Sequence, residues 1–413
     1  MKTAIFTICA KNYLAQAYTL KESFCRNNED TEFFIFLSDR KDIDWLSDEI
    51  VELNDSWIPN WQKMAFKYNV IEFSTSIKPF CFKKLFEEGF ERIIYLDPDI
   101  YVTSNLQYIF DLLNEKSIVL SPHYCNIQEK YTGSVTEEEL LWVGIYNLGF
   151  CAIKNDIIGN NIIKWWCNRL SNKCYADHKD GLHVDQKWMD FIPAFYPNDV
   201  CITHHMGINP AIWNLHEREL LIENNEYKIK NIETEEVFPL LFFHFSGFDP
   251  FNKTVLNRRH PKYSSDKFPS FIPLIDEYVK SEYENGYDKY SKLSYSFNSF
   301  ENGDNIIPLH RRLYRSLEEL MNDIDPFSTN SKIYNLIKGN KLLTGIKGNS
   351  FKTFTKEQSL NKDKFIRLIT GGLILIKKLF GIKYYAALLN NLKTLIRLEN
   401  QIFLLKKDIF NDK

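Results

Sequence analysis

The chain has 413 residues, of which 44% are hydrophobic, 25% are charged and 15% are aromatic. This composition is typical of a globular protein with one large domain plus an appendage, and it excludes a chain that is disordered over most of its length. The net charge is only −3. Because no run of about 20 uncharged apolar residues occurs, we expect no membrane-spanning helix.

The N-terminal residues MKTAIFTICA, followed by LAQA, resemble a short secretory signal. Lys11 and Asn12 interrupt the apolar run before the Ala-x-Ala site, so we expect the first strand of a core instead. The eight cysteines include no Cys-x-x-Cys pair, and several lie in apolar runs. This pattern indicates reduced thiols in a cytoplasmic protein and argues against a zinc site.

The first 330 residues alternate between strand and helix patterns. Short apolar runs predict buried strands, and apolar residues at spacings of 3 and 4 predict helices. One helical segment contains Pro79, and because proline is tolerated in the first turn of a helix, this helix is expected to begin near Lys78. The alternation predicts an α/β fold. The expected strands are 4–10, 32–39, 93–96 and 116–124, and the expected helices are 13–27 and 74–88.

Two carboxylates, Asp97 and Asp99, flank Pro98 directly after the apolar strand 93–96. Ligands of open α/β sheets bind at the carboxyl ends of the strands, and an extended backbone with a fixed proline would aim both side chains at one point. Oxygen ligands at this spacing suit Mg²⁺ or Mn²⁺. The alternative is a turn in which the aspartates cap backbone amides.

Seven motifs in series give the chain a more specific resemblance. They resemble nucleotide-sugar-dependent glycosyltransferases of the GT-A fold, most of all glycosyltransferase family 8 and related bacterial polysaccharide enzymes. The motifs are ICAKNY (8–13), FLSDR (36–40), STSIKPF (74–80), YLDPDI (95–100), YNLGF (146–150), LHVDQKWMD (182–190) and FFHFSGF (242–248).

This resemblance implies a Rossmann-like, nucleotide-binding mixed sheet flanked by helices. It also implies a hexosyltransferase that moves a sugar, with retention, from a nucleotide-diphosphate donor to a glycan or lipid-linked saccharide. Such an enzyme would act in the synthesis of a bacterial surface polysaccharide such as lipopolysaccharide. A bound Mn²⁺ or Mg²⁺ would neutralise the diphosphate as the glycosyl bond breaks.

The resemblance also implies roles for individual residues. A third metal ligand is expected at His244, and its alternative is a core histidine. Asp39 is expected to bind the base or the ribose of the nucleotide, and its alternative role is to cap a turn. Lys78 is expected to reach the sugar or diphosphate of the donor, and its alternative is a place on a solvated helix face. The implied metal ligands are Asp97, Asp99 and His244, the implied catalytic residues are Asp185, Gln186 and Lys78, and the implied donor-binding residues are Thr7, Ala10, Lys11, Asn12, Asp39, Lys78, Asp97, Asn147, Gly149 and Gly247.

The chain departs from the family pattern after Gly247, because FFHFSGFDPF lacks the Lys-Pro-Trp that usually follows the glycine. The lysine that would contact the diphosphate is then either missing or replaced by Lys253, Arg258 or Arg259. The departure also weakens the implication of retention.

The C-terminal region is chemically different from the rest of the chain. Residues 331–413 hold 17 Lys and Arg against 5 Asp and Glu, a net charge of +12, which leaves −15 for residues 1–330. We therefore expect a catalytic domain over 1–330 and a mainly helical region over 331–413. Segment 365–407 spaces lysines between apolar residues, which is typical of a small helical domain or a helix packed on a partner. The other interpretation is a basic amphipathic anchor on an anionic membrane surface, which together with the resemblance would be the inner face of a bacterial membrane. No nucleic-acid-binding module is visible.

Three other functions compete with sugar transfer. A glycoside hydrolase needs two facing carboxylates about 5 to 9.5 Å apart, and Asp97 and Asp99 are too close in sequence to face each other comfortably. A noncatalytic carbohydrate-binding protein would need neither metal nor nucleotide. A nucleotidyltransferase would be expected to carry a Gly-rich, basic loop after the first strand, and AKNYLAQA is not such a loop.

Overall fold

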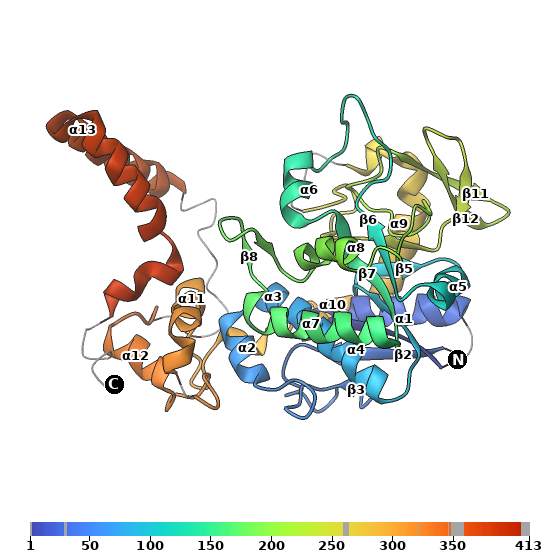
Figure 1. The fold of residues 1–413 in the computed structure, drawn as a ribbon, viewed down its shortest axis with the longest axis horizontal. Coiled ribbons are helices and arrows are strands. Elements are labelled where there is room, and N and C mark those ends of the chain that lie inside the picture. The colour runs from blue at the N-terminus through green and yellow to red at the C-terminus, as the bar shows by residue number, and fades with distance from the viewer. Residues whose placement is uncertain are drawn as a thin grey trace. The chain divides into compact units, whose positions relative to one another are not determined.

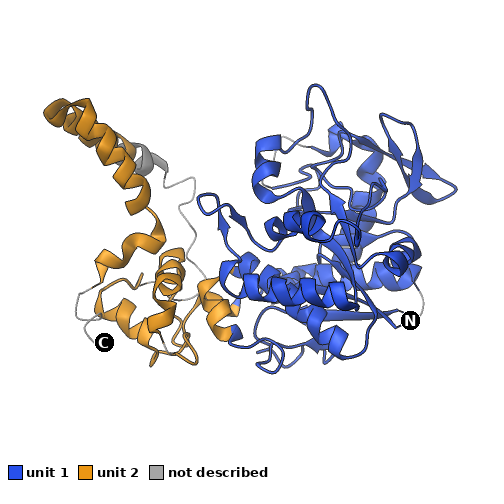
Figure 2. Ribbon diagram, in the orientation of Figure 1, with its two compact units in different colours: residues 1–61, 70–295 blue, residues 62–69, 296–413 orange. Residues whose placement is uncertain are grey.

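The computed structural model describes residues 2–28, 31–258, 264–321, 323–345, 347 and 359–405. The chain forms two compact units, which we call unit 1 (1–61 and 70–295) and unit 2 (62–69 and 296–413), coloured separately in Figure 2. Unit 2 joins residues 296–330 to the basic C-terminal region, whereas the sequence analysis placed them with the catalytic domain. The catalytic boundary at residue 330 stays a prediction.

Unit 1 is built around a seven-stranded mixed sheet with the strand order β10-β6-β7-β4-β1-β2-β3. All neighbouring strands are parallel except that β7 runs antiparallel to both β4 and β6. The predicted α/β fold, with a mixed sheet flanked by helices, is confirmed. The strands are β1 (Thr3–Cys9), β2 (Glu32–Leu37), β3 (Ile50–Val51), β4 (Arg92–Leu96), β6 (Ile118–Pro122), β7 (Tyr146–Lys154) and β10 (Val200–Ile202).

Helices cover both faces of this sheet because successive residues of β1 point to opposite sides. The ring of Phe6 meets Phe82 of α4 edge to face, with 4.8 Å between centroids, whereas Ile5 lies in a buried cluster with Phe24 of α1. Helix α7 packs beside α4 (Figure 1). The helices of unit 1 are α1 (Leu14–Asn27), α3 (Val70–Ser76), α4 (Lys78–Glu87), α5 (Gln107–Glu115), α6 (Glu137–Val143), α7 (Ile157–Lys173), α8 (Ile192–Phe195), α9 (Ile272–Glu284) and α10 (Tyr287–Tyr290).

The helix expected over 74–88 is in fact two helices. Helix α3 ends at Ser76, and α4 begins at Lys78 with Pro79 in its first turn. The proline therefore starts a helix, as predicted, and residues 74–76 belong to the preceding one. This break matters for the site because it places Lys78 at the amino end of α4.

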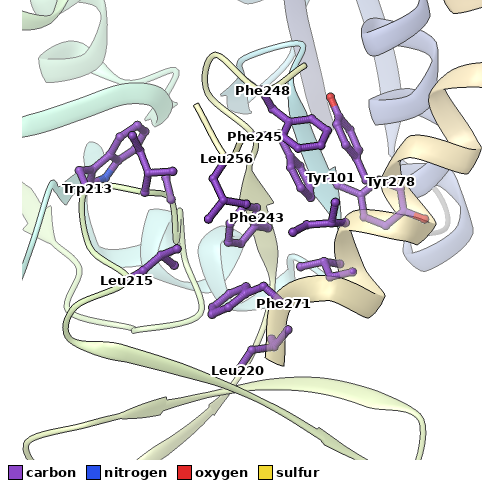
Figure 3. Close-up of a cluster of buried hydrophobic side chains, with 14 of the residues drawn as sticks. Tyr101, Trp213, Leu215, Leu220, Phe243, Phe245, Phe248, Leu256, Phe271 and Tyr278 are labelled. Carbon is purple, nitrogen blue, oxygen red and sulfur yellow. The ribbon is translucent and has the colours of Figure 1, made fainter. Parts of the chain in front are cut away.

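The described residues of unit 1 also form three small sheets, and one of them begins directly after β4. This ribbon pairs β5 (Ile100–Val102) with β14 (Phe242–His244) in antiparallel register, so that His244 lies opposite Ile100. Phe243 and Phe245, on either side of His244, enter a buried apolar cluster with Tyr101 and Tyr278 (Figure 3). The remaining strands are β8 (Ala176–Asp177), β9 (Leu182–His183), β11 (Arg218–Glu223), β12 (Glu226–Asn231) and β13 (Val237–Pro239).

Unit 2 is helical. Its helix α11 carries the buried Arg311, whose guanidinium donates hydrogen bonds to the carbonyl oxygens of Ala65, Phe66 and Tyr68 at 3.0, 2.8 and 2.7 Å. These bonds satisfy carbonyl groups that the end of a helix leaves without partners. The helices are α2 (Trp61–Lys67), which begins in unit 1, α11 (Pro308–Leu317), α12 (Lys332–Gly339) and α13 (Ser359–Leu395).

Helix α13 has a kink at Gly381, where φ is 78°. Many of its large apolar side chains are exposed, and several occur in adjacent pairs, such as Ile374 with Leu375 and Leu379 with Phe380. Adjacent residues lie about 100° apart around a helix axis, so the apolar surface is wider than a single stripe. Within the described ranges, no helix combines the length and the apolar character needed to cross a membrane.

Candidate active site

Asp97, Asp99 and His244 come together beyond the end of β4. Their ligand atoms all lie within 4.8 Å of one another. The imidazole Nε2 of His244 is 3.1 Å from Asp99 Oδ1 and 3.7 Å from Asp97 Oδ2. Partial burial and the charge of Asp99 raise the pKa of Asp97, against the opposing effects of Lys78 and His244.

The local sequence explains this convergence. The apolar residues of β4 bury the strand, and Asp97 follows it, with its backbone NH bonded to the Gly149 carbonyl at 2.8 Å. Asp99 directly precedes β5, and its carbonyl accepts the NH of Phe245 at 2.8 Å. Because successive side chains of β14 alternate, the side chain of His244 points to the opposite side of the strand from Phe243.

These three side chains fit a divalent cation. Two carboxylates that share a site repel each other unless a cation lies between them, and the donor set of two oxygens and one imidazole nitrogen is one that Mn²⁺ accepts. Among the described residues, this is the group of histidine, cysteine and acidic side chains that can hold a metal.

Lys78 and Asp185 form a buried ion pair next to this triad. The Lys78 ammonium lies 2.5 Å from Asp185 Oδ2 and donates to the Leu148 carbonyl at 2.7 Å, with side-chain exposures of 1% for Lys78 and 2% for Asp185. Burial lowers the pKa of Lys78, but Asp185 and Asp97 outweigh it and the net shift is upward. Burial likewise raises the pKa of Asp185, although the positive charge of Lys78 acts to lower it. The alternative that Lys78 lies on a solvated helix face is wrong.

Gln186 and Asn147 hold the backbone around the site. The Gln186 side chain accepts the NH of Leu148 at 3.0 Å and donates to the Val143 carbonyl at 2.9 Å. Asn147 Oδ1 accepts the NH of Gly149 at 3.1 Å. Gly149 itself has no space for a side chain, because an added Cβ would lie 2.3 Å from His244 Cε1.

One cavity of about 420 Å³ in unit 1 is lined by most of these groups, although Asp99 is not among its lining residues. Its wall also contains the indole of Trp213, which meets the His244 ring edge to face at 5.2 Å. Of the residues predicted from the sequence, the cavity brings together Lys78, Asp97, Asn147, Gly149, Asp185, Gln186 and His244.

The remaining predicted residues do not line this cavity as far as the structure describes the chain. Ala10 and Lys11 follow β1, which is a parallel neighbour of β4, so they emerge at the same sheet edge as Asp97. Lys11 is buried and pairs with Asp42. Thr7 and Asn12 belong to the same segment, with Thr7 inside β1 and Asn12 in the 3₁₀ turn Lys11–Tyr13.

Asp39 follows β2, and its carboxylate accepts the NH of Arg40 at 2.8 Å. This contact is the turn cap that the sequence analysis gave as the alternative to nucleotide binding. Gly247 has a φ of +67°, a conformation that favours glycine.

The cations offered as replacements for the missing family lysine are engaged elsewhere. Lys253 lies 2.7 Å from Asp276, and Arg258 lies 3.3 Å from Asp249. Arg259 falls outside the described residues.

Three residues around the triad were missed by sequence reasoning. Tyr95 donates its hydroxyl to Asp97 Oδ1, Asn209 lies 3.1 Å from His244 Nδ1, and His123 lies 3.3 Å from the Asn147 amide. Tyr95 is two residues from Asp97, and residues at i and i+2 share a strand face, a signal that could have identified it. Asn209 and His123 carry no comparable signal.

Comparisons with known proteins give partial similarities. No protein-family model matches the chain. The uncharacterized protein YfnF of Bacillus subtilis (strain 168) is 24% identical over 312 residues, which cover 74% of this chain and 99% of that protein.

Among solved structures, the galactosyltransferase LgtC in complex with donor and acceptor sugar analogues is similar at 16% identity, over 67% of this chain and 95% of that chain, with a TM-score of 0.39. The glycosyltransferase GlyE of Streptococcus pneumoniae TIGR4 is similar at 14% identity, over 76% of this chain and 73% of that chain, with a TM-score of 0.34.

Proposed function

We propose that this protein is a metal-dependent glycosyltransferase that moves a hexosyl group from a nucleotide-diphosphate sugar to a saccharide acceptor. One observation carries the proposal. Asp97 and His244 line one cavity together with the buried pair of Lys78 and Asp185, and Asp99 completes the triad with its Oδ1 3.1 Å from His244 Nε2. The resemblance of seven sequence motifs to nucleotide-sugar glycosyltransferases led us to expect this combination of residues. The same resemblance implies a role for each residue.

The triad would hold Mn²⁺ or Mg²⁺, which when bound neutralises the charge that develops on a diphosphate leaving group. Asp185 is the carboxylate that faces the sugar. It can accept hydrogen bonds from sugar hydroxyls and stabilise the positive charge of an oxocarbenium-like transition state. Lys78 favours the ionised form of Asp185 and holds its carboxylate in place through their 2.5 Å contact.

Gln186 contributes differently in this proposal. Both ends of its side-chain amide are bonded to backbone groups, of Leu148 and Val143, so it fixes the shape of the donor pocket beside Asp185. The segment that follows β1, with Ala10, Lys11 and Asn12, would hold the nucleotide at the same sheet edge. We further propose retention of anomeric configuration, as in the family that the motifs resemble.

The reaction class is tested by incubating the full chain with a panel of nucleotide sugars and Mn²⁺. Release of a nucleoside diphosphate with transfer of the sugar supports the proposal, and NMR of the product reports its anomeric configuration. Release of pyrophosphate would indicate a nucleotidyltransferase instead. Hydrolysis of nitrophenyl glycosides without metal would indicate a glycoside hydrolase, and binding of saccharides without turnover would indicate a noncatalytic protein.

For the C-terminal region we propose contact with an anionic membrane surface at the inner face, which would bring the enzyme to a lipid-linked acceptor of a surface polysaccharide. The exposed apolar side chains of α13 and the net charge of +12 over 331–413 support this. Flotation with vesicles containing anionic lipid should recover the full chain but not a chain that lacks residues 359–413. Equal flotation of both chains would contradict the membrane contact and leave the proposed chemistry untouched.

A further inference from the structure

A chain of hydrogen bonds runs from the His244 ring into the interior of unit 1, away from the proposed cation. His244 Nδ1 lies 3.1 Å from Asn209 Oδ1, and the Asn209 amide nitrogen lies 3.0 Å from Asn147 Oδ1. The Asn147 amide nitrogen then lies 3.3 Å from His123 Nε2, and His123 Nδ1 lies 3.1 Å from the Ile145 carbonyl. All four side chains are at most 8% exposed.

Backbone groups at both ends determine where the protons lie. The NH of Gly149 is a donor, so the Asn147 atom that it contacts at 3.1 Å must be the acceptor oxygen. The Asn147 amide nitrogen therefore donates to His123 Nε2. At the far end the Ile145 carbonyl can only accept, so His123 carries its proton on Nδ1. Burial lowers the pKa of His123 to about 4, which agrees with a neutral ring.

The same reasoning orients Asn209. Since Asn147 presents an oxygen, Asn209 must turn its amide nitrogen toward it, and the Asn209 oxygen then faces His244. An oxygen beside Nδ1 requires a proton on Nδ1. Nε2, which points at Asp97 and Asp99, is then the nitrogen that can be free of a proton.

The backbone around Asn209 holds its side chain in this orientation. Asn209 has a φ of +57°, a left-handed conformation that asparagine tolerates better than most residues. Its carbonyl accepts the Asn214 amide at 3.3 Å, and the next carbonyl, of Pro210, accepts the NH of His244 at 2.9 Å. These bonds hold the Asn209 side chain and the His244 ring in one fixed relation.

We propose that Asn209, oriented by Asn147, is a positioning residue that keeps the proton of His244 on Nδ1 and presents Nε2 to the cation. This inference rests on the proposed metal-dependent function. Partners of metal-bound histidines typically change metal affinity about 10- to 100-fold when removed. The loss of the Asn209 side chain should therefore weaken Mn²⁺ binding although Asn209 does not contact the ion.

The test measures Mn²⁺ affinity of the full chain by titration calorimetry or by the electron paramagnetic resonance of free Mn²⁺. Asn209→Ala and Asn209→Gly should each weaken binding about 10- to 100-fold. The glycine variant keeps the left-handed backbone and guards against misfolding. Asn28→Ala is the matched control, because Asn28 is a buried asparagine whose side chain bonds to the backbone of Phe24 and Leu106 and not to the triad, and it should leave affinity unchanged.

A spectroscopic measurement separates positioning from general loosening. In the Mg²⁺-loaded protein, imidazole ¹⁵N spectra should show a His244 Nδ1–H that is protected from solvent exchange, and in Asn209→Gly this signal should be lost to exchange. Wild-type Mn²⁺ affinity in both Asn209 variants would overturn the inference. If the wild-type chain itself binds no Mn²⁺, the proposed metal-dependent function fails, and that result is distinguishable from the first.

Discussion

Gly149 offers a sharp perturbation of the proposed metal centre. It lies in β7, next to the ring of His244, and a Cβ built on it would lie 2.3 Å from His244 Cε1 and 2.7 Å from Nδ1. The Gly149 backbone has no positive φ, so Gly149→Ala introduces no backbone strain. Steric conflict with the imidazole, and to a smaller extent with Asn147 Oδ1 at 2.9 Å, is thus the main effect of the added methyl group.

The required movement can be worked from these distances. Ordinary contact of a Cβ begins near 3.4 Å, so the imidazole must retreat by about 1 Å, whereas metal–ligand distances tolerate only about 0.2 Å. The Gly149→Ala protein should therefore bind Mn²⁺ at least about 10-fold more weakly. Overpacking of a buried site also lowers the free energy of unfolding by roughly 1 to 3 kcal/mol.

Mn²⁺ titration and urea denaturation of the same variant measure both effects. Gly371→Ala is the control, because Gly371 lies in α13 with open space around it. This control should keep wild-type Mn²⁺ affinity and gain up to about 1 kcal/mol of stability from the better helix propensity of alanine. If Gly149→Ala binds Mn²⁺ as well as wild type does, the placement of His244 as a ligand is refuted.

Two further predictions concern buried charges. Lys78→Met leaves the Asp185 carboxylate buried without its partner, so it should lower the free energy of unfolding by roughly 3 to 5 kcal/mol, measured by urea denaturation. The double variant Lys78→Met/Asp185→Asn removes the buried charge as well, so it should recover much of this loss. Equal losses of unfolding free energy in the single and the double variant would mean that the unpaired charge of Asp185 is not the cause of the destabilisation. Burial raises the pKa of Glu282 from 4.5 to about 8. Between these two pH values the folded state keeps a proton that the unfolded state has lost, so the free energy of unfolding should fall as the pH rises from 4.5 to 8. Glu282→Gln should remove up to roughly 4 kcal/mol of this fall, measured by urea midpoints at pH 5 and pH 8.5, and an unchanged pH profile would contradict the shift.

The sequence predicted the elements that carry the site because their signals are local. The apolar run before Asp97 marked β4, and Pro79 marked the start of α4 at Lys78. The position of His244 followed from the order of motifs along the chain. Its place beside Asp99 depends on the pairing of β14 with β5, which no local pattern reveals.

The contacts between side chains could not be predicted in the same way. Lys78 and Asp185 are 107 residues apart, and Asn209 is 35 residues from His244, so periodicity gives no signal for either contact. The orientation of Asn209 depends on hydrogen bonds that begin at the backbone of Gly149, and such a network appears only when the strands are placed in register.

In the proposed function, Asp97, Asp99 and His244 hold a cation that sugar transfer requires. The most direct test of this role is the release of nucleoside diphosphate from a panel of nucleotide sugars, with Mn²⁺ and with chelator, by the wild-type chain and by Asp99→Ala. We predict release by wild type that depends on Mn²⁺ and is lost in Asp99→Ala. Release that persists in chelator, or in the variant, would contradict this role.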